Sequence, residues 1–358
     1  MKKMLHEEHY VRFDKSITQI VKGFALIFMM LLHCYGRENY DAIIDFSQSL
    51  VVPFFHPEFK ICVGMFVFMV GYGYSFSIKK DWKYSLQHIK KLLNPFWTIL
   101  FVFTFPFCFD NVVHDFKISI YNLFGIDSSF NYYSWFVYFF IFAMVVMPFI
   151  SRFIDKKPIR NTIIVIVVAS LFAVIVHEVH RLFAVFDIMI PNVVDNKPHL
   201  AFFNCCMMTP IMSLGYLFAH EGYYERIKVS DKPRLYTFII CLVIILLSFI
   251  LRHLTSNIHN PFQLDIFYAP LVIGSIVVLF NRFRWTYFRR LMIKIGELSV
   301  YMWFFHALFY TKAVRWFYQP VITIFNDINL VVLWTIILTF FASWLIKSIV
   351  DAIYQRIS

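Results

Sequence analysis

Charged residues are scarce in this chain. Aspartate, glutamate, lysine and arginine make up 15% of its 358 residues, whereas 60% are hydrophobic and 20% aromatic. Soluble domains average about 25% charged residues, so this composition excludes an ordinary water-soluble protein. The long apolar runs do not alternate with period two, which predicts membrane-spanning helices and argues against a β-barrel.

Metal-ligand spacing is also missing. The six cysteines lie mostly within apolar runs, and no spacing among them is typical of a metal site, so we read them as small packing residues. His177, Glu178 and His180 come close to a zinc-protease motif, but only one residue separates Glu178 from His180 where that motif needs two. A solvated polar loop is favoured there. We expect no metal and no tightly bound cofactor.

No cleavable signal peptide is evident. The first apolar run contains Lys22 and His33, and no small-residue cleavage site follows it. We therefore expect the first helix to remain attached. The whole chain, 1–358, reads as one transmembrane domain with a short polar lead at 1–16 and no appended soluble domain.

Ten apolar segments predict ten membrane spans, with both termini on one side. The predicted spans are 17–35, 61–77, 92–109, 133–151, 161–176, 200–219, 235–251, 266–281, 296–311 and 328–346. Of the 33 lysines and arginines, 24 lie on the side of the termini and 8 on the other. This bias predicts that both termini are cytoplasmic. The net charge of +11 is thus mostly a topology signal, and no nucleic-acid partner is expected.

The first span, 17–35, carries the clearest functional signal. Lys22 and His33 are eleven residues apart, which at ~100° per residue places them on one stripe of a helix, about 16 Å apart along its axis. Ionisable side chains in a membrane span are costly and mark a functional site by default. The alternative is that Lys22 extends to the head groups and His33 is a hydrogen-bonded core residue.

Further candidates lie on other spans. Lys90 and Lys91 open the third span and are either topology markers or point charges for a phosphate. Aromatic residues from Tyr133 to Phe136 suit an interfacial belt, although Trp135 would also suit stacking on a sugar ring. In the ninth span, Ser299 and His306 fall on nearly one stripe, and His306 lies at about the depth of His33. Two histidines at matched depth can line one cavity.

Taken together, these residues resemble the membrane acyltransferase-3 family of bacterial envelope acyltransferases over nearly the whole chain. Four patterns carry the resemblance: a basic residue and a histidine with ten residues between them (Lys22, Gly23, His33), an aromatic run leading to a glycine (66–72), a Trp-Phe opening of the fourth span (Trp135, Phe136), and a series in the ninth span (Gly296, Ser299, Tyr301, His306). Each pattern is weak alone, but their order and spacing together are fairly specific.

Several positions depart from the family's usual residues. Gln19 stands where an acidic residue is frequent, and Val70 stands where a serine is common. Lys22, Lys90 and Lys91 stand where arginines are usual, which keeps the positive charge but loses bidentate hydrogen bonding.

The resemblance implies transfer of an acyl group, most often acetyl, from cytoplasmic acyl-CoA to a hydroxyl of an extracytoplasmic polysaccharide or lipid-linked saccharide. It implies a multi-pass protein of the bacterial plasma membrane, with acyl-CoA as co-substrate. His33 would act as general base or as a transient acyl-imidazole nucleophile, and Lys22 would hold donor phosphate or polarise its carbonyl. Ser299, Tyr301 and His306 would line or orient the site, Trp135 would stack on the saccharide, and Lys90 and Lys91 would bind the donor.

Two other classes remain open at this stage. A transporter of a saccharide or lipid-linked intermediate would also bury charges, but the latter half contains no second copy of the Lys22–His33 helix. A membrane sensor or scaffold without activity would account for Gln19 and Val70, and it predicts that His33 is replaceable.

Overall fold

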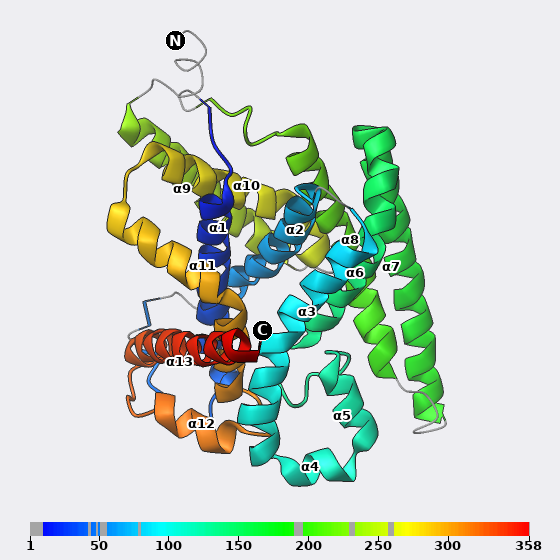
Figure 1. The fold of residues 1–358 in the computed structure, drawn as a ribbon, viewed down its shortest axis with the longest axis vertical. Coiled ribbons are helices and arrows are strands. Elements are labelled where there is room, and N and C mark those ends of the chain that lie inside the picture. The colour runs from blue at the N-terminus through cyan, green and yellow to red at the C-terminus, as the bar shows by residue number, and fades with distance from the viewer. Residues whose placement is uncertain are drawn as a thin grey trace.

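The structure is a computed structural model that describes residues 10–41, 44–47, 49–50, 56–77, 80–189, 196–228, 233–256 and 261–357. In these residues the regular structure is helical, with two isolated β-bridges and no strand (Figure 1). The elements are α1 (Lys15–Cys34), η2 (Arg37–Asn39), η3 (His56–Lys60), α2 (Ile61–Ser75), α3 (Trp82–Ile99), the π-helix η4 (Leu100–Thr104), η5 (Phe105–Phe107), α4 (Phe109–His114), α5 (Phe116–Leu123), α6 (Trp135–Lys156), α7 (Pro158–Met189), α8 (Asn196–Glu221), α9 (Arg234–Leu254), α10 (Pro261–Arg282), α11 (Thr286–His306), η6 (Ala307–Phe309), α12 (Arg315–Ile322) and α13 (Ile328–Ile357). The predicted all-α class is confirmed.

Eight described helices are long and apolar enough to cross a membrane: α1, α6, α7, α8, α9, α10, α11 and α13. The other two predicted spans are shorter or irregular. Helix α2 has 15 residues, and the predicted span 92–109 covers the end of α3, the π-helix η4 and the short η5. Pro106 accounts for the irregular end, because proline has no N–H and its ring collides with the carbonyl four residues earlier.

The predicted loop at 177–199 is wrong over its first part. Helix α7 continues through His177 and ends at Met189. The sequence holds a helical signal there, since Val179, Leu182, Phe183 and Phe186 follow the spacing i, i+3, i+4, i+7. His177 and Glu178 therefore lie on a helix, with 3.3 Å between His177 Nδ1 and Glu178 Oε1.

Two pairs of helices approach so closely that a glycine is required. A β-carbon on Gly296 of α11 would collide with the carbonyl oxygen of Gln19 in α1, and one on Gly71 of α2 would collide with that of Met212 in α8. Small residues allow such contacts between membrane helices. The first contact matters for function, because it sets α11 directly against α1, and the two helices lie side by side in Figure 1.

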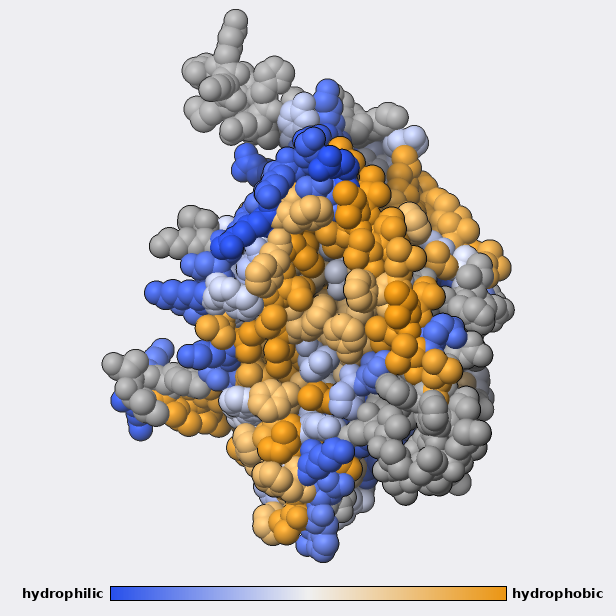
Figure 2. Space-filling model, turned by 90° about the vertical axis from the view of Figure 1, so that its right-hand side faces the viewer, coloured by the Kyte–Doolittle hydropathy of each residue, from blue (hydrophilic) through white to orange (hydrophobic). Residues whose placement is uncertain are grey.

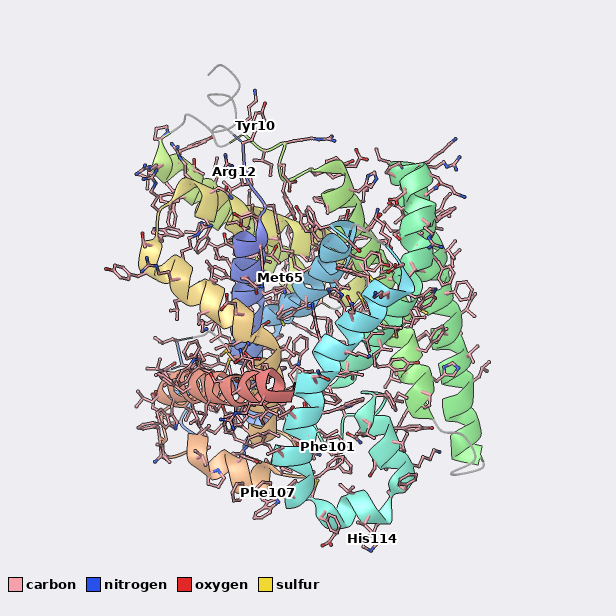
Figure 3. The ribbon with its side chains drawn as sticks, in the orientation of Figure 1. Tyr10, Arg12, Met65, Phe101, Phe107 and His114 are labelled. Carbon is pink, nitrogen blue, oxygen red and sulfur yellow. The ribbon has the colours of Figure 1, made fainter. Side chains whose placement is uncertain are left out.

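The molecule has a hydrophobic middle and hydrophilic ends. Figure 2 shows one face on which hydrophobic side chains form a wide area, with hydrophilic residues gathered above and below it. Figure 3 shows Tyr10 and Arg12 near the start of α1, with Phe107 and His114 at the opposite end of the molecule. This distribution fits a bundle that crosses a bilayer.

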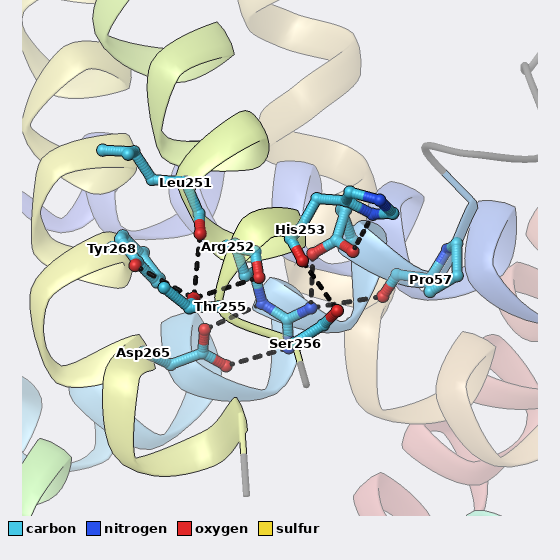
Figure 4. Close-up of polar contacts among 9 residues, drawn as sticks. Pro57, Leu251, Arg252, His253, Thr255, Ser256, Asp265 and Tyr268 are labelled. Atoms are coloured by element: carbon cyan, nitrogen blue, oxygen red, sulfur yellow. Dashed lines mark hydrogen bonds and ion pairs between the residues drawn. The ribbon is translucent and has the colours of Figure 1, made fainter. Parts of the chain in front are cut away.

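A buried ion cluster ties η3 to α9 and α10 (Figure 4). The Arg252 guanidinium donates from Nε to Asp265 Oδ1 at 2.9 Å and from Nη1 to Glu58 Oε2 at 2.9 Å. His253 Nδ1 lies 3.1 Å from the other oxygen of Glu58. Arg252, Glu58 and Asp265 are almost fully buried, so each charge depends on its partners. We assign this cluster a structural role.

Candidate active site

His33 lies in the last turn of α1, where the helix carbonyls have no partners within the helix. Three consecutive carbonyls accept hydrogen bonds from side chains of the following segment. His56 Nε2 lies 2.6 Å from the Leu32 oxygen, Asn39 Nδ2 donates to the His33 oxygen at 2.7 Å, and the Tyr40 hydroxyl donates to the Cys34 oxygen at 2.8 Å. These bonds fix the end of α1 and hence the position of the His33 ring.

His33 and His306 form a hydrogen-bonded pair. His33 Nδ1 lies 2.9 Å from His306 Nε2, and the two rings are nearly parallel, with 11° between their planes. His306 is the last residue of α11 and is 0% exposed. The two histidines, which were predicted to lie at about the same depth, are therefore in direct contact.

The backbone determines which ring nitrogens carry protons in the neutral pair. His306 Nδ1 lies 3.0 Å from the Met302 carbonyl oxygen, which can only accept, so this nitrogen carries the hydrogen. Neutral His306 then accepts at Nε2, and His33 Nδ1 must donate to it. The lone pair of neutral His33 lies on Nε2, which has no hydrogen-bond partner among the described residues. His33 is thus oriented to accept a proton or to attack through Nε2.

Tyr133 covers the His33 ring. The ring centroids are 3.4 Å apart with 10° between the planes, and Tyr133 is also parallel to His306, at 5.3 Å. Tyr133 lies in the segment just before α6 and is 6% exposed. The histidine pair therefore has an aromatic wall on one side.

Lys22 lines a cavity of about 530 Å³ between α1, α2, α3, α6 and α11. Its other lining residues are Lys15, Thr18, Gln19, Phe66, Met69, Val70, Gly73, Tyr74, Tyr84, His88, Lys91, Leu92, Phe136, Phe140, Met144, Ser299, Val300, Trp303 and Phe304. Lys22 and Ser299, predicted from different spans, thus share one cavity. His33 and His306 do not line it.

The cavity is electropositive and contains unpaired polar atoms. Lys15, Lys22 and Lys91 have no acidic partner among the described residues. Burial lowers the pKa of His88, and the nearby cations Lys91 and Lys22 lower it further. An anionic ligand suits such a lining, because phosphate groups are bound by lysine point charges.

Two buried oxygens in the same cavity lack partners. Gln19 Oε1 and the Tyr74 hydroxyl make no hydrogen bond within the described part of the chain. A buried polar atom without a partner costs about 1–3 kcal/mol, so these two atoms are more readily explained as contacts for a polar ligand.

Aromatic side chains separate this cavity from the histidine pair. Phe66, Phe136 and Trp303 pack together, with ring centroids 4.9 Å apart for Phe66 and Trp303 and 4.8 Å apart for Phe136 and Trp303. Trp303 Nε1 donates to the Tyr133 carbonyl at 3.3 Å, and Tyr133 in turn covers His33. The inner end of the cavity is therefore one aromatic layer away from the pair.

The remaining predicted residues lie outside this arrangement. Trp135 is half-buried against Phe136, with ring centroids 6.0 Å apart, and does not line the cavity. Tyr301 is buried and Lys90 is exposed, and neither lines the cavity. The described residues contain no group of three or more histidines, cysteines or acids that could hold a metal ion.

Tyr133 was predicted only as part of an aromatic belt, and Asn39, Tyr40 and His56, which cap α1, were not predicted as site residues. Only the position of Tyr133 next to the Trp135-Phe136 pattern could have singled it out. Asn39 and His56 lie in the short 3-10 helices η2 and η3, and Tyr40 directly follows η2. No spacing rule connects these short elements to His33.

Comparison with known proteins identifies one family. The family model described as an acyltransferase domain, of the acyltransferase-3 family, matches residues 18–348. No curated protein and no solved structure matches the chain. The matched range includes the histidine pair, α1 from residue 18 onward and every residue that lines the cavity except Lys15.

Proposed function

The chain belongs to the acyltransferase-3 family. On this premise we propose that it transfers an acetyl group from cytoplasmic acetyl-CoA to a hydroxyl of an extracytoplasmic polysaccharide or lipid-linked saccharide. The observation that carries the proposal is the His33–His306 pair, which leaves His33 Nε2 as a free base. We propose ten spans with both termini in the cytoplasm of a bacterial cell, so that the Lys22 cavity receives the donor.

In the proposed donor site, the diphosphate of acyl-CoA binds near Lys15 and Lys91 at the cavity mouth, with Lys90 as a further cation close by. Lys22 lies deeper and contacts a polar group of the extended arm. Ser299 supplies a hydroxyl on the same wall. The cavity's lysines and unpaired oxygens support this placement. The thioester must pass the aromatic layer of Phe66, Phe136 and Trp303 to reach His33.

In the proposed chemical step, His33 Nε2 takes the proton of the acceptor hydroxyl as its oxygen attacks the thioester carbonyl. The tetrahedral intermediate then collapses, the C–S bond breaks, and the CoA sulfur receives the proton from His33. The products are an ester and free CoA. His306 Nε2 accepts from His33 Nδ1 throughout, and so holds the ring and stabilises the imidazolium. Attack by Nε2 itself, through an acyl-imidazole, is the alternative route with the same nitrogen.

Tyr301 and Trp135 are assigned supporting positions in this scheme. Tyr301 lies in α11 between Ser299 and His306 and helps to orient them. Trp135 begins α6 directly after the segment that carries Tyr133. In this proposal its indole ring stacks on the saccharide.

The test is transfer of label from acetyl-CoA, radiolabelled in the acetyl group, to envelope glycans in membranes that contain the protein. We expect label with the wild-type chain and a loss of at least about 100-fold with His33→Ala, the usual contribution of a general base. His177→Ala is the matched control, because His177 is 51% exposed on α7, and it should retain full transfer. Equal label with His33→Ala would refute the mechanism. Absence of label with acetyl-CoA and with longer acyl donors would favour a transporter.

A further inference from the structure

The stacking of Tyr133 on His33 is closer than an incidental aromatic contact. The centroids are 3.4 Å apart and the planes differ by 10°. Neutral His33 gains ordinary packing from this arrangement. A protonated imidazole gains more, because the face of an aromatic ring attracts a cation.

Hydrogen bonds to α11 and the segment after it fix the backbone around Tyr133. Trp303 Nε1 donates to the Tyr133 carbonyl at 3.3 Å, and Asn131 Nδ2 donates to the Phe304 carbonyl at 3.0 Å. The Tyr132 N–H donates to Thr311 Oγ1 at 3.0 Å. The helix that carries His306 therefore also holds Tyr133 in place, and the three rings are positioned as a unit.

The hydroxyl of Tyr133 is buried and has no hydrogen-bond partner among the described residues. The side-chain oxygen of Asn131, a residue 1% exposed, is also buried without a partner in the described part of the chain. Buried polar groups in folded proteins are nearly always paired, and the Tyr133 ring lies against His33, so its unpaired hydroxyl indicates a polar ligand that binds beside His33.

We propose that Tyr133 is a catalytic residue of the acyl transfer, with two separable contributions. Its ring face stabilises the imidazolium that forms when His33 takes the acceptor proton. Its hydroxyl donates a hydrogen bond to the carbonyl oxygen of the thioester, which becomes negatively charged in the tetrahedral intermediate. Tyr133 keeps its own proton throughout. This inference rests on the proposed function.

Two substitutions separate the contributions. Tyr133→Phe removes only the hydroxyl, and we expect transfer at saturating acetyl-CoA to fall by about 100-fold, as for loss of one oxyanion donor, without a shift in the pH profile. Tyr133→Leu also removes the ring face. Its acidic limb should move to lower pH by about one unit, because the imidazolium loses a favourable contact. Tyr132→Phe, at a neighbouring residue that is 52% exposed, is the matched control and should leave rate and profile unchanged.

The outcomes distinguish this inference from the proposed function. If the wild-type chain transfers the acyl group and Tyr133→Phe does so at the same rate, the hydroxyl contribution is overturned and the proposed function stands. If the wild-type chain is active and the acidic limb of the pH–rate profile is the same in Tyr133→Leu, the ring contribution is overturned. Failure of the wild-type chain to transfer any acyl group would overturn the proposed function and this inference with it. Tyr133→Phe preserves the ring and its packing, so it stays decisive if Tyr133→Leu fails to fold.

Discussion

One hydrogen bond joins His33 and His306, and in the proposed mechanism neither ring performs its role without the other. The Met302 carbonyl orients His306, and His306 orients His33. An exposed histidine would have neither constraint. The proposed base is thus directed by a second neutral ring and a backbone carbonyl, without an acidic residue in the pair.

The two histidines should behave non-additively on substitution. We expect His33→Ala and His306→Ala each to lower the acetyl transfer rate by about 100-fold or more, and the double variant to be no slower than the slower single variant. A double-mutant cycle on initial rates measures this. Losses that multiply would mean that the two residues act independently.

Lys22 should act on donor binding more than on the chemical step, because it lies in the cavity and not beside the pair. We expect Lys22→Gln to raise the KM for acetyl-CoA by about tenfold with a smaller change in kcat, since it removes an interaction made before and during the reaction. Lys22→Arg keeps the charge and should recover most of the affinity. A selective fall in kcat for Lys22→Gln would instead assign Lys22 to the transition state.

At the scale of the elements, the contact between α1 and α11 decides whether the site can form. Gly296 faces the Gln19 carbonyl, and this contact holds the helices that carry His33 and His306 together.

Gly296→Ala should therefore lower thermal stability. The added β-carbon has no room against the backbone of α1, and overpacking of this kind costs about 1–3 kcal/mol. Gly73→Ala is the control for stability alone, since nothing lies within 4 Å of a β-carbon there. Thermal unfolding of both variants in detergent measures the difference, and equal melting temperatures would contradict the packing account.

The segment before α6 depends on Asp127. This carboxylate pairs with Lys197 and accepts hydrogen bonds from the Ser129 N–H at 2.6 Å and from Asn122 Nδ2 at 3.1 Å. Burial would raise its pKa, but the bonds from Lys197 and Ser129 outweigh burial and lower it. The stabilisation is therefore present above the unfolded-state pKa, and it is lost as the pH falls through the lower pKa of the folded state.

Asp127→Asn should thus destabilise the protein by about 2 kcal/mol at pH 7, where it removes a charge-assisted interaction. The difference from wild type should shrink as the medium is acidified below the pKa of about 3.9 of a free aspartate. Melting temperatures of the wild type and of Asp127→Asn, measured between pH 7 and pH 3, give this difference. A difference that is constant with pH would mean that the Asp127 charge contributes nothing.

Helical periodicity predicted the elements better than it predicted their ends. Lys22 and His33 were predicted to lie on one stripe of a helix, and α1 is continuous over both residues. The extension of α7 past His177 was missed because polar residues interrupt an otherwise helical spacing. The break after α3 depends on the local effect of Pro106, which an apolar run conceals.

At the scale of the whole molecule, the sequence predicted which helices carry the candidate site residues but not which of these residues are in contact. The span boundaries predicted that His306 and His33 lie at about the same depth, but they did not predict the hydrogen bond between the two rings. The position of Tyr133 over His33 could not be predicted. It is set by hydrogen bonds that involve Trp303, Asn131 and Thr311, and these residues are either distant in the sequence or outside any motif. The aromatic layer between cavity and pair is likewise a product of several helices.

The two candidate sites lie at different ends of α1. The cavity is lined by Lys15, Thr18, Gln19 and Lys22 from the first part of α1, and the histidine pair lies at the end of α1. We propose that the first end receives donor from the cytoplasm and the second serves an acceptor on the other side of the membrane.

The most direct test of this central claim is the sidedness of transfer in sealed vesicles prepared from cells that supply their own acceptor. Labelled acetyl-CoA does not cross a bilayer, so inside-out vesicles present it to the cytoplasmic face alone and right-side-out vesicles to the opposite face alone. The account predicts His33-dependent labelling of glycans in inside-out vesicles, and none in right-side-out vesicles until they are permeabilised. Equal His33-dependent labelling of sealed right-side-out vesicles would contradict it.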